Sequence, residues 1–216
     1  MLTTDSRIEE YIARHIDREP DNLHRLYRLV NTELLYSRMC SGHVQGRLLK
    51  MLTRMVAPHR VLELGTYAGY SALCIAEGLS GDDDRVDTIE LEDELEEFIR
   101  GAFDESEYGH RVRLHIGDAM EILPRLLAET SYDMVYIDAN KRHYVEYYNL
   151  LIERLRSGAF ILADNTLWDG KVADEAEHHD AQTRGIVAFN DLIADDERVE
   201  KVILPLRDGL TLIYKK

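Results

Sequence analysis

The stretch that decides the fold is Val61-Leu62-Glu63-Leu64-Gly65-Thr66-Tyr67-Ala68-Gly69-Tyr70-Ser71. It opens with a mostly apolar run typical of a buried strand and ends by entering an apolar helix. Gly65 lets the chain turn close to a ligand, and Gly69 opens a helix N-terminus, where unpaired N–H groups attract an anion. The stretch predicts an α/β protein. A plain tight turn fits it equally well, because the G-x-G-x-x-G spacing of a pyrophosphate site is absent.

Strands and helices alternate from residue 60 onward. Five strand–helix units imply a parallel, doubly wound sheet with helices on both faces. Two closing strands are joined by only a few residues, which permits a hairpin but not a parallel crossover. We therefore predict a Rossmann-like sheet of seven strands, mostly parallel, with an antiparallel last strand. The expected strands are residues 60–65, 85–90, 112–117, 132–138, 159–164, 199–204 and 210–214, and the expected helices are 70–79, 93–103, 119–129, 143–155 and one ending near 195.

Residues 5–57 are expected to form three helices, because apolar residues recur there at helical spacing. Pro20 fits the first turn of the second helix, and the third should run from Val44 to Val56. At 216 residues the chain is most simply one domain. We expect residues 1–57 to be a helical cover on an α/β core of residues 58–216.

Composition restricts the partners and the compartment. The net charge of −15 argues against nucleic acid or an anionic membrane, because long-range steering would be repulsive, although a local basic patch can survive it. Cys40 and Cys74 show no metal-binding spacing and are most simply reduced thiols. No signal-peptide core and no bilayer-spanning apolar run is present. We expect a cytoplasmic protein with no membrane partner.

Oxygen-bearing side chains end two of the predicted strands. Asp138 ends the run that begins at Met134, and Asp164 and Asn165 end the run that begins at Phe160. If the two runs are neighbouring parallel strands, about 5 Å apart, these side chains converge at one sheet edge. Two carboxylates and an amide suit a hard cation such as Mg2+ better than Zn2+. Either aspartate alone fits a loop cap or salt bridge, so the combination predicts the metal site.

Two further acids follow predicted strands. Glu90 ends the second strand, twenty-five residues after Gly65, and is placed to accept hydrogen bonds from ribose hydroxyls. A solvated helix-capping acid is the alternative. Asp118 and Ala119 follow the third strand, where an adenine could be held, and Asp118 also fits the N-cap of the next helix.

These elements together resemble the metal-dependent O-methyltransferases, the family of catechol and caffeoyl-CoA O-methyltransferases and their bacterial relatives. The resemblance covers roughly residues 39–214 and implies S-adenosylmethionine as the methyl donor. It implies Mg2+, or Mn2+ or Ca2+, held by Asp138, Asp164 and Asn165. For Met39, core packing has equal weight. The donor-binding residues that the resemblance implies are Met39, Glu63, Gly65, Thr66, Tyr67, Ser71, Glu90, Asp118, Ala119 and Asp138.

The same resemblance assigns the chemistry. A phenolic hydroxyl, with a pKa near 10, is a poor nucleophile at neutral pH, and a bound cation lowers that pKa. Lys141 matches the family's proposed general base, so Lys141 and Asp138 are the expected catalytic residues; an exposed loop lysine is the alternative. Trp168 is the best candidate for a wall against an aromatic substrate, and Tyr144 could also reach it, although core packing fits both. The pair His178-His179 has no third metal ligand and is read as surface loop.

The expected function is therefore a divalent-metal-dependent O-methyltransferase acting on a hydroxylated, catechol-like aromatic small molecule. One alternative is methylation of a hydroxyuridine in tRNA, as some bacterial relatives perform. A nicotinamide-dependent dehydrogenase and a non-catalytic cofactor-binding protein are remoter alternatives. The family often forms dimers, so a homodimer is expected. The substrate itself is not readable from the sequence.

Overall fold

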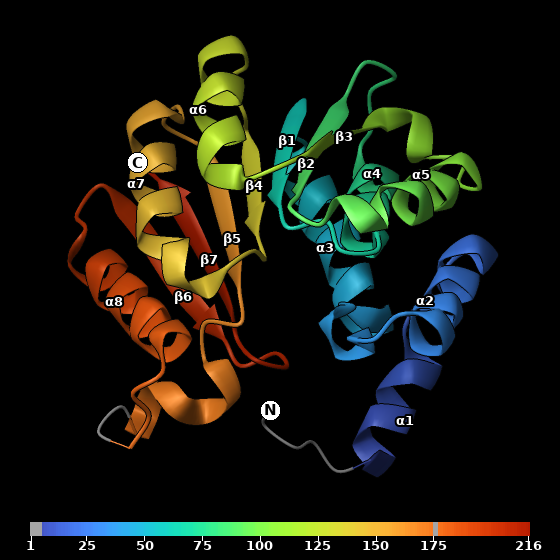
Figure 1. Ribbon diagram of the computed structural model, residues 1–216, viewed down its shortest axis with the longest axis horizontal. Helices are drawn as coiled ribbons and strands as arrows, with labels where there is room; N and C mark the ends of the chain where they lie inside the picture. The colour runs from blue at the N-terminus through green and yellow to red at the C-terminus, as the bar shows by residue number, and fades with distance from the viewer. Residues whose placement is uncertain (1–5, 175–176) are drawn as a thin grey trace. The chain divides into compact units, whose positions relative to one another are not determined.

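The computed structural model describes residues 6–174 and 177–216 (Figure 1). They divide into two compact units. The first unit consists of Arg60–Gly65 and Ala119–Lys216, and the second of residues 6–59 and Thr66–Asp118. The expectation of a single methyltransferase domain stays a prediction.

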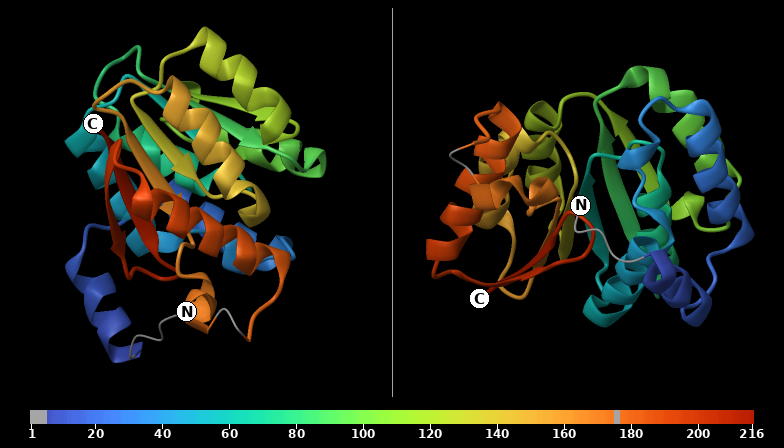
Figure 2. Two further views of the ribbon diagram at one scale, coloured as in Figure 1. Left: turned by 90° about the vertical axis from the view of Figure 1, so that its left-hand side faces the viewer. Right: turned by 90° about the horizontal axis from the view of Figure 1, so that it is seen from below.

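The first unit contains five strands and three long helices. Its strands follow the order β1-β4-β5-β7-β6, in which β1, β4 and β5 are parallel and β7 is antiparallel to both β5 and β6. Helix α7 packs between α6 and α8, and the three cover one face of these strands (Figures 1 and 2). The elements are β1 (Arg60–Leu64), α6 (Ala119–Glu129), β4 (Met134–Ile137), η4 (Lys141–His143), α7 (Tyr144–Arg154), β5 (Phe160–Asp164), η5 (Trp168–Asp174), α8 (Ala181–Asp195), β6 (Val199–Leu204) and β7 (Leu210–Lys215).

The second unit pairs two parallel strands with five helices. Helix α4 is mostly apolar and is buried along its whole length, where it packs against α3, β2 and β3. Its one charged residue, Glu77, is paired with Arg47 and Lys50 of α3. Helices α1 and α2 contribute the N-terminal part of the unit (Figure 1). The elements are α1 (Ser6–His15), α2 (Asp21–Glu33), η1 (Ser37–Met39), α3 (Gly42–Val56), α4 (Tyr70–Gly78), β2 (Arg85–Glu90), η2 (Asp93–Leu95), α5 (Glu96–Asp104), η3 (Gly109–Arg111) and β3 (Val112–Ile116).

The sheet has seven strands in the order β3-β2-β1-β4-β5-β7-β6. This order, with β7 as the antiparallel strand, confirms the predicted Rossmann-like topology. Each predicted strand and helix is present, with ends that differ by a few residues from those expected. No helix within residues 6–174 and 177–216 is long and apolar enough to cross a membrane.

Three local features differ from the sequence expectation. Pro20 is the N-cap residue of α2 and not part of its first turn, and α3 begins two residues before Val44. The segment after β5 contains the short helix η5, which is not among the expected helices. Trp168 and Asp169 at its start have left-handed backbone conformations, with φ of 46° and 55°, and no sequence pattern marks that kink.

Candidate active site

The ends of β4 and β5 bring two carboxylates together in the first unit. The strands are parallel neighbours, and their register pairs Ile137 with Ala163. Asp138 and Asp164 are the next residues along each strand, so they stand side by side at the carboxyl edge of the sheet. The predicted strand pairing is therefore confirmed.

Gly65 is required by the backbone at this edge. Its φ is +94°, and a Cβ atom there would lie 2.2 Å from the carbonyl oxygen of Asp138. Any side chain at residue 65 would therefore push the end of β1 away from the end of β4. This close packing explains the glycine whether or not a ligand approaches it.

The Asp164 carboxylate is held from two sides. The buried Tyr136 hydroxyl donates a hydrogen bond to its Oδ2 at 2.6 Å, and the backbone N–H of Asn165 donates to its Oδ1 at 2.8 Å. Asn165 has a φ of 58°, a left-handed conformation that asparagine tolerates better than most residues. These two hydrogen bonds fix the orientation of the Asp164 carboxylate, whose oxygen atoms are of the kind that bind hard cations.

Lys141 is paired with Asp138. Its Nζ lies 2.6 Å from Asp138 Oδ1, and its side chain is only 8% exposed. The alternative of an exposed loop lysine is therefore wrong. The ammonium group lies 5.3 Å from the centre of the Tyr144 ring and 6.0 Å from that of Trp168. Cation and aromatic rings attract one another at these distances, which further fixes the lysine.

Gly185 packs against the backbone of Lys141. A Cβ atom at this position in α8 would lie 2.3 Å from the Lys141 carbonyl oxygen, so only glycine lets α8 pack this closely against η4. Sequence reasoning missed this residue. An isolated glycine inside a helical pattern is the signal that marks it, because glycine there usually has a packing reason.

Burial disfavours the charged form of Asp138. It raises the pKa of Asp138 to about 6, and the nearby Asp164 carboxylate adds to the rise, while Lys141 and Arg207 oppose it. Burial, together with the same two carboxylates, also raises the pKa of the Tyr144 phenol well above its usual value. Two carboxylates beside one lysine therefore form a site that a cation would stabilise.

Tyr144 and Trp168 have different environments. Tyr144 is fully buried, and its hydroxyl donates to the carbonyl oxygens of Asp164 at 3.0 Å and Ile137 at 3.2 Å. The structure thus gives Tyr144 a role in tying the two strand ends together and no free group for a substrate. Trp168 is partly exposed, and its ring centre lies 6.0 Å from the ammonium group of Lys141 and 5.8 Å from that of Lys171.

The glycine-rich turn of the second unit is tied to the end of β2. Glu90 accepts hydrogen bonds from the backbone N–H of Tyr67 at 2.6 Å and from that of Glu92 at 2.9 Å. Thr66 and Thr88 share a hydrogen bond of 2.6 Å between their hydroxyls. The capping alternative for Glu90 is thus partly realised, while each of its oxygens keeps a lone pair for a ribose hydroxyl.

The helix that follows this turn begins after a glycine in the left-handed backbone conformation. Gly69 is the N-cap of α4 with a φ of +81°, and a Cβ atom there would lie 2.6 Å from the Phe103 ring. Ser71 lies in the first turn of α4, where unpaired N–H groups favour an anionic ligand.

The remaining donor-binding candidates have varied positions. Met39, at the end of η1, is 56% exposed, so its core-packing alternative is wrong. Glu63 is fully buried in β1, Asp118 is exposed, and Ala119 is the buried first residue of α6. In the first unit lie Glu63, Gly65, Ala119 and Asp138, and in the second lie Met39, Thr66, Tyr67, Ser71, Glu90 and Asp118.

The described part of the chain contains no group of three His, Cys, Asp or Glu side chains that could hold a metal ion. The predicted ligands are the carboxylates of Asp138 and Asp164 and the amide of Asn165, and asparagine is not one of those four residue types. Its amide oxygen is nevertheless a suitable ligand for a hard cation.

Comparison with known proteins decides the family. A family model described as O-methyltransferase matches residues 13–216. The chain belongs to the O-methyltransferase family. Tricin synthase 2 of Oryza sativa subsp. japonica is 34% identical over 98% of this chain and 75% of its own length. Caffeoyl-CoA O-methyltransferase of Petroselinum crispum is 32% identical over 90% of this chain and 84% of its own.

Solved structures of methyltransferases share the fold. TomG from Streptomyces achromogenes, in complex with SAM, has 30% identity and a TM-score of 0.89, with 97% of this chain and 96% of TomG covered. SAH-bound PaMTH1 from Podospora anserina has 27% identity and a TM-score of 0.89, covering 98% and 94% of the two chains. The protein is thus an O-methyltransferase with the Rossmann-like methyltransferase fold, as the resemblance found in the sequence implied.

Proposed function

We propose that this O-methyltransferase transfers a methyl group from S-adenosylmethionine to a hydroxyl of a catechol-like aromatic small molecule, with the help of a divalent cation. The observation that carries the proposal is the pair of fixed carboxylates, Asp138 and Asp164, beside the buried Lys141. The ligands named for TomG and PaMTH1 support the choice of methyl donor. The names of the plant relatives, a caffeoyl-CoA O-methyltransferase among them, support an aromatic acceptor.

The side chains present fit a hard cation. Asp164 is oriented by Tyr136 and by the backbone N–H of Asn165, and the pKa of Asp138 is raised mainly by burial and further by the nearby Asp164 carboxylate. Asp138, Asp164 and Asn165 would hold Mg2+, or Mn2+ or Ca2+, through oxygen atoms. A bound divalent cation supplies Lewis-acid activation, which makes a phenolic hydroxyl a better nucleophile at neutral pH.

The protein's own groups then position the acceptor and move its proton. We assign Lys141 Nζ, in its neutral amine form, as the proton acceptor, because it is buried among the Tyr144 and Trp168 rings and oriented by Asp138 at 2.6 Å. The exposed part of the Trp168 ring offers an apolar surface for the aromatic acceptor. For the donor we assign Met39, Glu63, Gly65, Thr66, Tyr67, Ser71, Glu90, Asp118, Ala119 and Asp138.

A labelled methyl donor offered with a panel of acceptors tests the proposal. The panel includes catechols, monophenols and unmodified and hydroxyuridine-containing tRNA. We expect label in the catechols, and calorimetry should show binding of S-adenosylmethionine without acceptor. Label in tRNA alone would overturn the acceptor class, and failure to bind the donor would overturn the proposal as a whole. We further propose a cytoplasmic homodimer, to be checked by sedimentation.

A further inference from the structure

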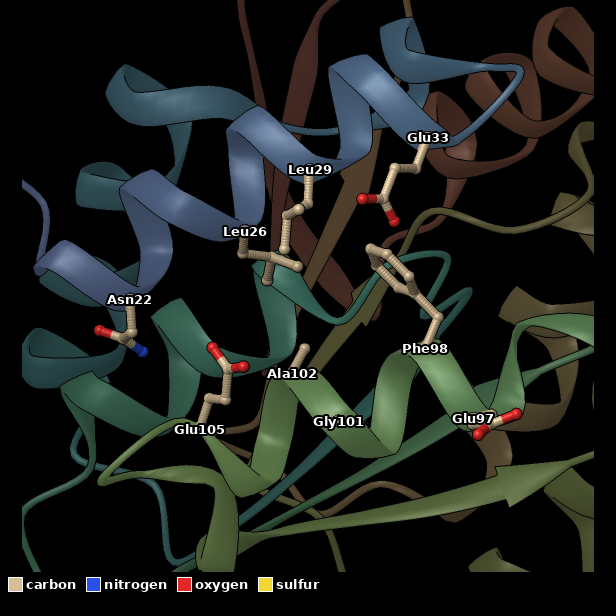
Figure 3. A pocket seen from close by; sticks show the side chains of 9 residues that line it. All are labelled: Asn22, Leu26, Leu29, Glu33, Glu97, Phe98, Gly101, Ala102 and Glu105. Carbon is tan, nitrogen blue, oxygen red and sulfur yellow. The ribbon is translucent and has the colours of Figure 1, made fainter.

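A groove between α2 and α5 of the second unit lies apart from all the residues assigned above. Its volume is about 290 Å3, close to the lower end of the range for small-molecule sites. Figure 3 shows side chains from both helices turned into the space between them. None of the residues assigned to the methyl donor, the cation or the acceptor lines this groove.

The middle of the groove is apolar. Leu26 and Leu29 line it from α2, and Phe98 and Ala102 line it from α5 (Figure 3). A Cβ atom built at Gly101 would have no heavy atom within 4 Å, so the α5 side of the groove is open at that residue. A ligand of modest width could therefore lie against these side chains and remove apolar surface from water.

The ends of the groove are acidic. Glu33 and Glu97 stand near Phe98 in Figure 3. Within residues 6–174 and 177–216, neither of these two side chains has a hydrogen-bond or ion-pair partner. Glu105 and Asn22 stand at the opposite end (Figure 3). Glu105 is only partly compensated, by an ion pair of 3.2 Å with Arg25 in which both side chains are more than half exposed.

The surrounding sequence strengthens this negative charge. Residues 93–105 contain six carboxylates and one arginine. That arginine, Arg100, already pairs with Glu96 at 2.7 Å. The local potential therefore attracts cations and repels phosphates, lipid headgroups and nucleic acids.

We propose that this groove binds a linear aliphatic polyamine. The methylene chain would cover the apolar middle, and ammonium groups would meet the acidic ends. Glu97 and Glu105 are eight residues apart, which corresponds to about 12 Å along a helix and suits a molecule with cationic groups at both ends. An inorganic cation would make no use of the apolar middle, and a single ammonium group at Glu33 and Glu97 would leave Glu105 with only its exposed ion pair to Arg25.

Calorimetric titration of the full chain with spermidine at low ionic strength tests the proposal without any methyl donor or acceptor. We expect saturable binding of one molecule per chain. The double variant Glu33→Gln/Glu97→Gln should bind at least ten times more weakly. The matched control Glu9→Gln/Glu10→Gln, which removes the same charge from exposed positions on α1, should bind within twofold of the unchanged protein.

A second variant tests the apolar part. Gly101→Phe should fill the groove and abolish binding, and the open space at Gly101 allows the fold to accept it, which thermal unfolding would check. Equal weakening by both Glu-to-Gln pairs, or unchanged binding by Gly101→Phe, would overturn the proposal. A further outcome would also overturn it: the unchanged protein is a dimer that does not bind spermidine, and Gly101→Phe converts this dimer to monomers. The groove would then be an interface between copies of the chain.

Discussion

At the scale of single residues, the cluster of Asp138, Asp164 and Lys141 at the ends of β4 and β5 depends on a hydrogen bond that no sequence pattern predicts. Tyr136 lies in the middle of an apolar strand and would ordinarily be counted as core. Its hydroxyl instead donates to Asp164, the carboxylate proposed to bind the cation. A residue that orients a metal ligand in this way commonly affects metal affinity about 10- to 100-fold.

Replacing Tyr136 with Phe should therefore weaken Mg2+ binding about tenfold or more, as measured by calorimetry. The loss of a buried hydrogen bond to a charged group should also lower the free energy of unfolding by about 1.5–3 kcal/mol. Tyr148→Phe is the matched control, because it removes a similar bond, of 2.8 Å to Asp196, far along the chain from the cluster. Equal Mg2+ affinity in the two variants would contradict the role of Tyr136.

The assignment of Lys141 predicts a specific kinetic loss. Lys141→Met should lower kcat about 10^2- to 10^4-fold, because a positioned proton acceptor contributes about that much, while calorimetric binding of S-adenosylmethionine stays unchanged. Lys171→Met removes the other lysine beside Trp168 and should retain most of the activity. If both variants lose activity equally, positive charge near Trp168 matters and proton transfer by Lys141 does not.

At the scale of elements, glycines set how closely the site's supports pack. Gly185 in α8 and Gly101 in α5 are both helical glycines, but a Cβ atom would meet the Lys141 carbonyl at 2.3 Å in the first case and nothing within 4 Å in the second. Gly185→Ala should therefore destabilise the protein by about 1–3 kcal/mol through overpacking and also reduce activity. Gly101→Ala should stabilise it by about 0.5–1 kcal/mol through helix propensity. Urea unfolding measures both, and equal shifts would refute the packing argument.

The elements themselves were predictable because their signals are local. The alternation of apolar runs and helical periods predicted each strand, and the short link after Leu204 predicted the antiparallel β7. The left-handed kink at Trp168 and Asp169 was not predictable, because contacts distant in sequence hold it. There, the backbone N–H of Leu167 donates to the Asp208 carbonyl at 2.7 Å, across a loop-to-hairpin contact that no local pattern encodes.

The same distinction applies to the candidate site. The neighbouring positions of Asp138 and Asp164 followed from strand order, which sequence can suggest. The burial of Lys141, the structural bonds of Tyr144 and the exposure of Met39 did not follow, because each depends on how helices and loops pack in three dimensions. Sequence patterns located the site, and packing decided which alternatives for its residues hold.

At the scale of the whole molecule, the charge of Asp138 makes the stability of the fold depend on pH and on a bound metal ion. The pKa of Asp138 is raised to about 6 in the fold, against about 3.9 in an unfolded chain. The folded protein thus holds this proton more tightly than the unfolded chain does. The contribution of Asp138 to the free energy of unfolding is therefore full below pH 3.9 and is lost as pH rises through 6. A cation competes with the proton, so Mg2+ should raise the melting temperature more at pH 7.5 than at pH 5.

Thermal unfolding with Mg2+ and with EDTA, across pH 5–8, measures this effect. Asp138→Asn is the control, because it removes the titrating group and should flatten the pH dependence of the Mg2+ shift. A Mg2+ shift of equal size at pH 5 and pH 7.5 in the unchanged protein would show that Asp138 does not take part in binding the cation.

The central claim is that a divalent cation at Asp138, Asp164 and Asn165 is needed for methyl transfer. The most direct measurement is the rate of methyl transfer to catechol by protein that has been treated with EDTA and dialysed. We predict no transfer above background until Mg2+ is added, and no recovery with Mg2+ in the Asp164→Ala variant. Full activity in the continued presence of EDTA would contradict the claim.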